Sequence, residues 1–187
     1  MIGVLVSGSG TNLQALLDAG LPVVATASNK AEAYALERAR DAAVDVASFP
    51  IGAYASRELR DAVMAEWLTE CGVKLVVCAG YMHLLTPTFL ERFPSSVINV
   101  HPSLLPEFPG TQAIEDALAA GVVTTGVTIH YVDEGVDTGP VIEQCEVTIN
   151  EGETMDSLSL RIHEVEHRLL PEVVARLVEE LRSAAAR

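Results

Sequence analysis

Cysteine is scarce in this chain, and its spacing excludes two common frameworks. The three cysteines, Cys71, Cys78 and Cys145, are odd in number, widely spaced and without a CxxC pair. They predict neither a disulfide framework nor a zinc site, and no metal is expected because the sequence shows no ligand cluster. Two of them stand beside apolar runs, where we expect buried, unreactive thiols.

Basic residues are also few. Only 12 lysines and arginines stand against 26 aspartates and glutamates, for a formal charge of −14. General electrostatic capture of nucleic acid or of an anionic membrane surface is therefore disfavoured. We expect the excess acid mainly on solvated faces, such as 151–156 and Glu179-Glu180. An anionic ligand would have to be held by local geometry.

Long hydrophobic runs are missing as well. No apolar stretch approaches the roughly 18 residues of a membrane-spanning helix. The start, MIGVLVSGSG, lacks a basic region and runs into a glycine turn, which predicts a first strand rather than a signal peptide. We therefore expect a cytoplasmic protein. With 187 residues, 49% of them hydrophobic and 20% charged, and without a repeat or linker, the chain fits one globular domain.

Strand and helix patterns alternate along the chain. In the first half, we expect strands at 2–6, 23–27, 46–49 and 74–78, with helices after the glycines at 8–10, at 31–43, and from the cap Ser56 to about Cys71. In the second half, strands at 97–100, 126–131 and 141–149 accompany helices at 112–120 and 156–182, the last interrupted or kinked at Pro171. The final two strands form a hairpin. The fold class is therefore α/β, a single-domain Rossmann-like sheet, mixed but mostly parallel, with helices on both faces.

The segment Ser7-Gly8-Ser9-Gly10-Thr11-Asn12 lies between the first strand and the first helix. Backbone amides at a helix start suit a phosphate, but a plain tight turn capped by Thr11 or Asn12 fits about as well. Leu13 stands where a dinucleotide site has its third glycine, and no acidic residue follows the second strand, so NAD is not expected. The lysine of a nucleotide triphosphate loop is absent too. A phosphomonoester on a smaller molecule remains.

Two polar residues leave the strand at 97–100 together. Asn99 and His101 are two residues apart, so an extended chain points them the same way, and prolines at 102, 106 and 109 stiffen the segment after the strand. A lone histidine is more often a hydrogen-bonded structural residue than a catalyst. Asp137 lies in the turn-rich segment VDEGVDTGP and is, by itself, best explained as a turn aspartate.

Taken together, these segments resemble a known family. The resemblance rests on SGSGTNLQALLDA, ASNKAEAYALERA, AGYMHLLTPTF, INVHPSLLPEFPGT and GVTIHYVDEGVDTGPVIEQ, which follow one another between positions 7 and 144, and on Glu166-His167 in the last helix. They are similar to segments of the folate-dependent formyltransferase family, where they occur in the same order. The resemblance covers almost the whole chain.

The resemblance implies an enzyme of purine biosynthesis. The amine of glycinamide ribonucleotide would attack the formyl carbon of 10-formyltetrahydrofolate, the co-substrate, and form a tetrahedral oxyanion. Asn99, His101 and Asp137 would be catalytic. Asn99 and a protonated His101 would donate to the oxyanion, and Asp137 would orient His101 and help to move a proton through water to the folate nitrogen. Which group is the formal base stays open.

The resemblance also implies two binding regions. The ribonucleotide would contact Gly10, Thr11, Asn12 and Glu166, with its phosphate at the helix start and Glu166 on the glycinamide side. The folate pocket would be lined by Arg57, Met82, His83, Leu84, Leu85, Asp133 and Val136. Plain core packing explains at least one of Met82, Leu84 and Leu85 as well. Many relatives carry arginine where this chain has His83. The resemblance therefore does not imply an ionic contact at this position, nor equally tight binding of the folate glutamate tail.

The same resemblance implies one formyltransferase domain over 1–187. About 1–95 would hold the ribonucleotide phosphate, and about 96–187 would supply catalysis and folate binding. The expected partners are these two small molecules, without nucleic acid or membrane, and a homodimer is left open. Formyltetrahydrofolate deformylase adds an N-terminal domain, which we do not expect here because the first strand is predicted from residue 2. Methionyl-tRNA formyltransferase adds an RNA-binding domain, which we do not expect either, and the charge of −14 disfavours a tRNA partner. A non-catalytic module that binds a phosphate ligand is the alternative of another class.

Overall fold

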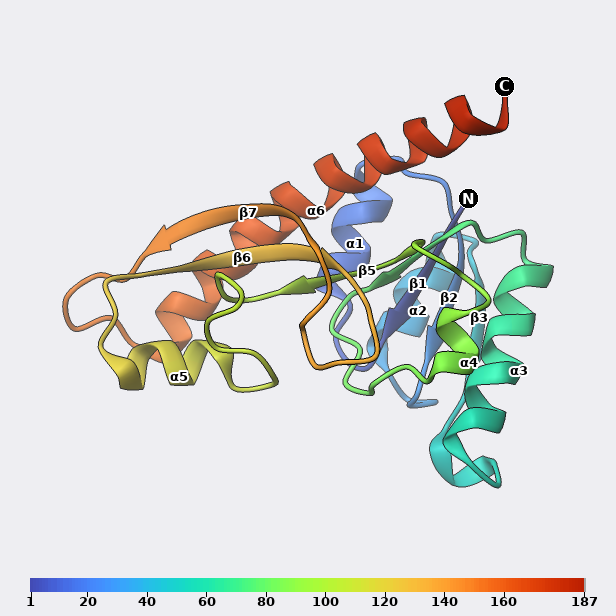
Figure 1. The fold of residues 1–187 in the computed structure, drawn as a ribbon, viewed down its shortest axis with the longest axis horizontal. Helices are drawn as coiled ribbons and strands as arrows, with labels where there is room; N and C mark the ends of the chain where they lie inside the picture. The colour runs from blue at the N-terminus through green and yellow to red at the C-terminus, as the bar shows by residue number, and fades with distance from the viewer. Residues whose placement is uncertain (187) are drawn as a thin grey trace.

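A seven-stranded sheet runs through the molecule (Figure 1). The structure, a computed structural model, describes residues 1–186. The order is β3-β2-β1-β4-β5-β6-β7, with strands β1 (Ile2–Val6), β2 (Val23–Ser28), β3 (Asp45–Ser48), β4 (Leu75–Cys78), β5 (Val97–His101), β6 (Thr124–Tyr131) and β7 (Val141–Thr148). Strands β1 to β5 pair in parallel, and β6 pairs antiparallel with both β5 and β7. The predicted mixed, mostly parallel sheet with a terminal hairpin is confirmed.

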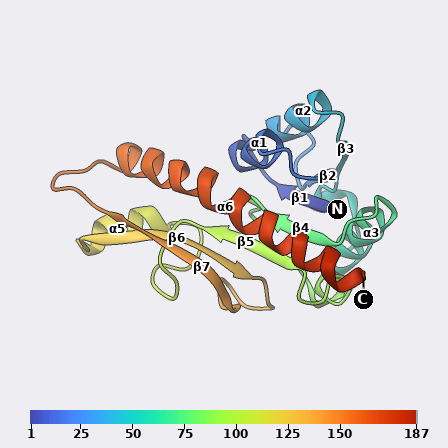
Figure 2. The same ribbon diagram turned by 90° about the horizontal axis from the view of Figure 1, so that it is seen from above.

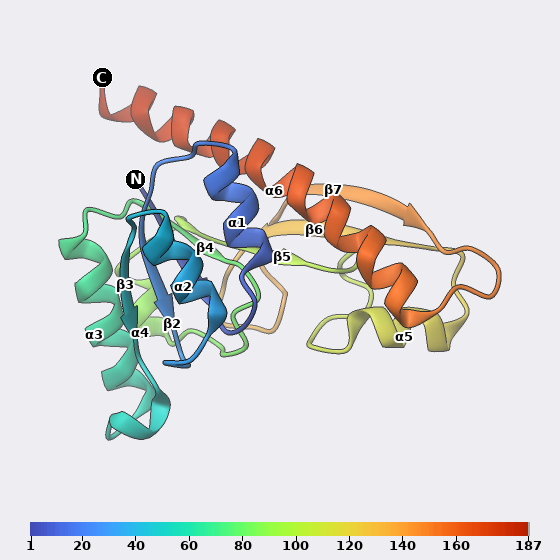
Figure 3. The same ribbon diagram turned by 180° about the vertical axis from the view of Figure 1, so that it is seen from behind.

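Helices cover both faces of the sheet, as predicted. They are α1 (Thr11–Asp18), α2 (Tyr34–Asp41), the 3-10 helix η1 (Ile51–Ala53), α3 (Arg57–Glu70), α4 (Pro87–Leu90), α5 (Ala113–Ala120) and α6 (Met155–Ala185). Apolar side chains of α1, α2 and α6 share one buried cluster, and those of α3 and α4 share a second. Figure 3 shows α1, α2 and α6 over one face, and Figure 2 shows α6 running along the sheet. No helix within residues 1–186 is both long and apolar enough to cross a membrane.

Helix α2 is shorter than predicted. It begins at Tyr34 rather than at residue 31, because residues 29–32 make the bend and turn that follow β2, and Ala33 is still extended. Alanine favours helix, but the chain must first reverse direction, and helix propensity does not report that turn. The short helices η1 and α4 were not predicted, since three or four residues carry no helical periodicity.

Helix α6 passes through Pro171 without a break. Of the predicted interruption or kink, the interruption was wrong, and the kink stays a prediction. Proline removes a backbone hydrogen bond and crowds the preceding turn, which costs about 3 kcal/mol in an ordinary helix interior. Here burial holds the helix on both sides of the proline, through Leu169, Leu170, Val173 and Val174 in the α1–α2–α6 cluster.

Parallel pairing sets the carboxyl ends of β1, β4 and β5 side by side. The glycine turn 7–10 follows β1, the loop 79–86 follows β4, and the last residues of β5 include the polar Asn99 and His101. The segment between β6 and β7 brings Asp137 to the side chain of Asn99. Stretches far apart in the sequence therefore meet at one edge of the sheet.

Candidate active site

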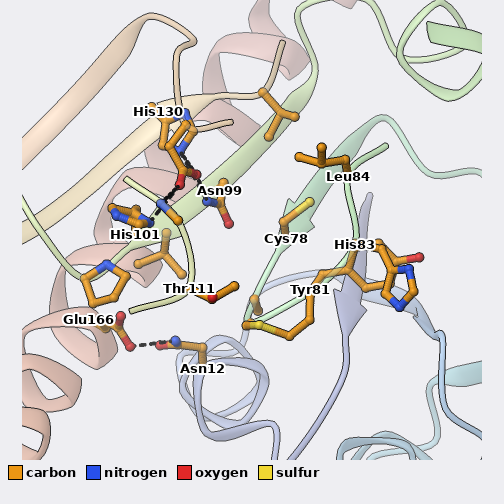
Figure 4. A pocket seen from close by; sticks show the side chains of 18 of the residues that line it. Asn12, Cys78, Tyr81, His83, Leu84, Asn99, His101, Thr111, His130 and Glu166 are labelled. Atoms are coloured by element: carbon orange, nitrogen blue, oxygen red, sulfur yellow. Dashed lines mark hydrogen bonds and ion pairs between the residues drawn. The ribbon is translucent and has the colours of Figure 1, made fainter. Parts of the chain in front are cut away.

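A cavity of about 580 Å³ opens at this edge (Figure 4). Its walls are the glycine turn, the loop 79–86, the end of β5, the segment between β6 and β7, and one face of α6. The volume lies in the range of pockets that bury small ligands. Asn99, His101 and Asp137 all line it, so the structure brings the three predicted catalytic residues together.

Asp137 is the centre of a polar cluster. Its Oδ2 accepts from the Gly110 amide at 2.8 Å and lies 3.4 Å from His101 Nδ1. Its Oδ1 accepts from Asn99 Nδ2 at 3.3 Å and lies 3.5 Å from His130 Nε2. The residue has a left-handed φ of 53°, which aspartate tolerates better than most residues and which is frequent at functional sites.

Backbone carbonyls decide which ring nitrogens of the two histidines carry hydrogen. His101 Nε2 lies 2.9 Å from the Phe108 oxygen, and His130 Nδ1 lies 2.8 Å from the Tyr131 oxygen. A carbonyl oxygen only accepts, so these nitrogens are the donors. The other nitrogen of each ring faces Asp137. It carries a lone pair in the neutral ring and a hydrogen in the protonated ring. The cluster can therefore take up a proton without losing its carbonyl contacts.

Asp137 is held in its charged form. Burial by itself would raise its pKa, but the hydrogen bonds from His130 and the Gly110 amide, together with the charges of His101 and His130, outweigh burial and lower the pKa to about 2. Opposite charges and donated hydrogen bonds favour a carboxylate in this way. The carboxylate can thus stabilise a positive charge on either histidine.

The proline-rich loop after β5 supplies partners for both His101 and Asp137. The Phe108 carbonyl accepts the hydrogen bond from His101 Nε2, and the Gly110 amide donates a hydrogen bond to Asp137. Ser103 braces the loop from within, since its Oγ donates to the Glu107 oxygen at 2.6 Å. The stiffness that the sequence indicated therefore orients His101 and Asp137 relative to each other.

The glycine turn leads into α1 without a side-chain cap. The cap is Gly10, in the left-handed region with φ 74°, and Thr11 is already the first helical residue; no side chain caps the helix. Of the two alternatives for this segment, the turn capped by Thr11 or Asn12 is therefore wrong. A Cβ at Gly10 would lie 2.5 Å from the Ala35 Cβ, because α2 packs directly against the turn. The uncapped amides at this helix start can bind an anion.

Asn12 and Glu166 meet across 154 positions of sequence. Asn12 Nδ2 donates to Glu166 Oε2 at 2.9 Å, as the dashed line in Figure 4 marks. Burial raises the pKa of Glu166, against the lowering effects of the Asn12 hydrogen bond and the nearby His163. Asn12 Oδ1 is buried and has no partner among the described residues, so it can accept a hydrogen bond from a ligand. Gly10 and Thr11 line the same part of the cavity.

Residues 1–174 match the sequence model of a family described as formyl transferase. The chain belongs to the formyl transferase family. It is 44% identical to the solved phosphoribosylglycinamide formyltransferase of Streptococcus pneumoniae TIGR4, with a TM-score of 0.91 over 95% of this chain and 98% of that one. It is 37% identical to the phosphoribosylglycinamide formyltransferase of Bacillus subtilis, over 94% of this chain and 93% of that protein. The resemblance noted in the sequence is confirmed.

A longer relative shares this formyl transferase unit. The chain is 43% identical over 95% of its length to the trifunctional purine biosynthetic protein adenosine-3 of Chironomus tentans, but it spans only 13% of that protein. It therefore corresponds to one part of the trifunctional protein and to nearly the whole length of the Bacillus enzyme.

Six of the seven residues predicted to contact folate line the cavity of this formyl transferase: Met82, His83, Leu84, Leu85, Asp133 and Val136. Met82 and Leu84 are 58% and 47% exposed at its rim, whereas Leu85 is 6% exposed and packs in the α3–α4 cluster. Core packing thus accounts for Leu85. Arg57 is not among the lining residues; its Nη2 donates to the Leu84 oxygen at 2.8 Å from outside the loop.

Sequence reasoning missed His130. It is 2% exposed, lines the cavity and contacts both Asn99 and Asp137. The signal was present in the hairpin pattern, since GVTIHY forms β6 and the register with β5 pairs His130 directly with Asn99. Only the register, which the sequence did not specify, makes that pairing visible.

Proposed function

We propose that the protein transfers the formyl group of 10-formyltetrahydrofolate to the amine of N1-(5-phospho-D-ribosyl)glycinamide, giving formylglycinamide ribonucleotide and tetrahydrofolate in purine biosynthesis. The observation that carries the proposal is the cluster of Asn99, His101 and Asp137 on the wall of a cavity that reaches from the glycine turn to the loop 79–86. The relatives named phosphoribosylglycinamide formyltransferase support it, because they match over nearly their whole length.

Formyl transfer needs donors where negative charge develops. The amine attacks the formyl carbon, and the carbonyl oxygen becomes an oxyanion in the tetrahedral intermediate. Asn99 Nδ2 and, when the ring is protonated, the Nδ1–H of His101 both lie near an anion, the Asp137 carboxylate, at 3.3 and 3.4 Å. These separations are longer than good hydrogen bonds to a carboxylate, so an oxyanion in the cavity can compete for the same protons. Protic groups preorganised in this way stabilise the intermediate without reorganising water.

The same cluster can move the proton. The attacking amine must lose a proton, and the departing folate nitrogen must gain one. Asp137 stands between two imidazoles whose free nitrogens face it, so a proton can pass among the three groups and, through water, reach the folate nitrogen. Asp137 also keeps a protonated His101 charged during the transfer.

The two substrates would enter from opposite walls. The phosphate would bind the uncapped amides at Gly10 and Thr11, and Asn12 with Glu166 would hold the ribose and glycinamide end. The folate would lie against the loop 79–86 and the segment 133–136. Figure 4 places the Asn12–Glu166 pair and Leu84 on different sides of Asn99, where the formyl carbon would sit. The proposed division at about residue 95 and the cytoplasmic location stay predictions, and a homodimer stays open.

Folate product formation from 10-formyltetrahydrofolate tests the proposal. The assay is run with the ribonucleotide and again with water as the only acceptor. Turnover that requires the ribonucleotide is expected; release without it would make the protein a deformylase, and no reaction in either tube would favour a binding module. His101→Ala should lose at least about 10²-fold in kcat while it stays folded, against an unchanged surface control, Gln112→Ala.

A further inference from the structure

Side chains of helix α3 and of Ser7, which follows β1, hold the loop 79–86. The Met82 amide donates to the Ser7 hydroxyl at 2.9 Å, and the Thr86 amide donates to Asp61 Oδ2 at 2.8 Å. Arg57 donates to the Leu84 carbonyl at 2.8 Å, and Arg60 Nη1 lies 3.3 Å from His83 Nδ1. Three of these four partners lie on α3. A loop that lines a cavity is thus fixed from behind at four of its eight residues, rather than by packing alone.

Arg60 and Asp61 form a buried ion pair behind the loop. Both side chains are 0% exposed, and Arg60 Nε donates to Asp61 Oδ1 at 2.8 Å. Taking two charges out of water is costly, and a buried pair of this kind is often no more stabilising than apolar residues of the same volume. Stability therefore does not account for the pair. Each partner has a second contact, and both of those contacts end on the loop.

The contact with Arg60 determines the state of His83. A guanidinium has only donors, so His83 Nδ1 must accept through a lone pair. The ring proton then lies on Nε2, and the imidazole is neutral. His83 lines the cavity, so Nε2–H is the one donor that the ring can offer to a ligand.

The surroundings agree with a neutral ring. Burial lowers the pKa of His83 first, the positive charges of Arg60, Arg57 and Lys30 lower it further, and Asp61 opposes them. The neighbouring Tyr81, whose ring centroid lies 5.9 Å away, has a pKa raised by burial and stays uncharged. These are the charged and titratable groups that face His83 from α3, from the end of β2 and from its own loop.

We propose that Arg60 is a positioning residue for the folate co-substrate: paired with Asp61, it fixes His83 as a neutral imidazole that offers Nε2–H to an oxygen of the folate. The inference rests on the proposed function for the identity of the ligand, but the state of His83 does not depend on it. Because the donor is neutral, binding at this wall should change little with pH across the neutral range.

Nuclear magnetic resonance of the ring nitrogens tests the state of His83 without turnover. The protein is labelled with ¹⁵N-histidine, and the His83 signals are identified by their loss in His83→Gln. We expect the Nε2–H form at pH 7. In the double variant Arg60→Met with Asp61→Asn, which keeps an acceptor for the Thr86 amide, we expect mixed tautomers and a higher titration midpoint. A protonated His83 at pH 7, or hydrogen on Nδ1, would overturn the inference.

Kinetics test the consequence. In the double variant the KM for 10-formyltetrahydrofolate should rise about tenfold, the loss expected for about one hydrogen bond, with kcat and the ribonucleotide KM nearly unchanged. His83→Gln, which keeps a neutral donor, should bind folate better than His83→Phe, and the exposed control Arg92→Met should match the wild type. An unchanged folate KM in the double variant would refute the positioning role.

The two proposals can fail separately. If the wild type transfers no formyl group, the proposed function fails, whereas the tautomer of His83 is still decided by the resonance experiment. If the double variant does not fold, Arg60→Lys takes its place, because an ammonium cannot bridge two partners with the planar fork of a guanidinium. A folate KM and a His83 tautomer that are both unchanged in Arg60→Lys would overturn the inference.

Discussion

Neutralising Asp137 tests the proposed catalytic role of the cluster most directly. Asparagine suits the position, because it tolerates the left-handed φ of 53° and its oxygen can still accept from the Gly110 amide. Asp137→Asn therefore removes the charge and the proton acceptor while it keeps the shape of the loop.

The size of the effect can be worked out from the pKa. A fall from 3.8 to about 2 in a side chain that is 14% exposed corresponds to about 2 kcal/mol of preference for the charged form. Lost from the transition state, this is a factor of about 30 in rate. General acid–base catalysis typically contributes a further factor of about 10² to 10⁴, so kcat should fall by about 10³ or more.

The assay is formyl transfer to the ribonucleotide at saturating concentrations of both substrates. Glu134→Gln, an exposed carboxylate in the same segment, is the matched control and should keep wild-type kcat. The depressed pKa of Asp137 gives stability that is present above the unfolded value near 3.8 and is lost as pH falls toward 2. Asp137→Asn should thus unfold more easily by about 2 kcal/mol at pH 7, with a gap that closes in acid. A folded variant whose kcat is within threefold of the wild type would refute the reasoning.

Three other substitutions or treatments probe the rest of the cavity. Gly10→Ala must place a Cβ 2.5 Å from its neighbour at positive φ, so chemical denaturation should show it less stable than Gly20→Ala, which shares positive φ in open space, by more than about 1 kcal/mol. Glu166→Gln should raise the ribonucleotide KM about tenfold and leave the folate KM unchanged. Because burial raises the pKa of Glu166, its charged form costs stability as pH rises through that pKa; the variant should be at least as stable as the wild type at pH 7, and a less stable variant contradicts this. Cys78, whose pKa burial raises to about 12, should resist iodoacetamide at pH 8 until the protein unfolds, as peptide mass spectrometry would show.

Local signals predicted most of the fold. The Ser56 cap is present, since its hydroxyl accepts from the Leu59 amide, and the β-branched run at β4 forms a buried central strand. Predictions failed where a neighbouring element overrides the local preference. Gly10 caps α1 at a point where Ala35 of α2 leaves no room for a Cβ, and α6 continues through Pro171 because both flanks of the proline are buried.

The amino-acid sequence by itself determined the class of the protein. Periodicity and turn residues are properties of short segments, so they predict an α/β sheet, and ordered motifs indicate a formyl transferase before any contact is known. The motifs also include Asn99, His101 and Asp137, although not the contacts that join them.

Only the tertiary structure decided how these groups act. The β5–β6 register sets His130 beside Asn99. In the proline-rich loop, the Phe108 carbonyl accepts from His101 and the Gly110 amide donates to Asp137. The guanidinium behind His83 comes from a helix more than twenty positions earlier in the chain. Hydrogen bonds and charge pairs act over a few ångströms of space, and sequence separation does not reveal which groups come that close.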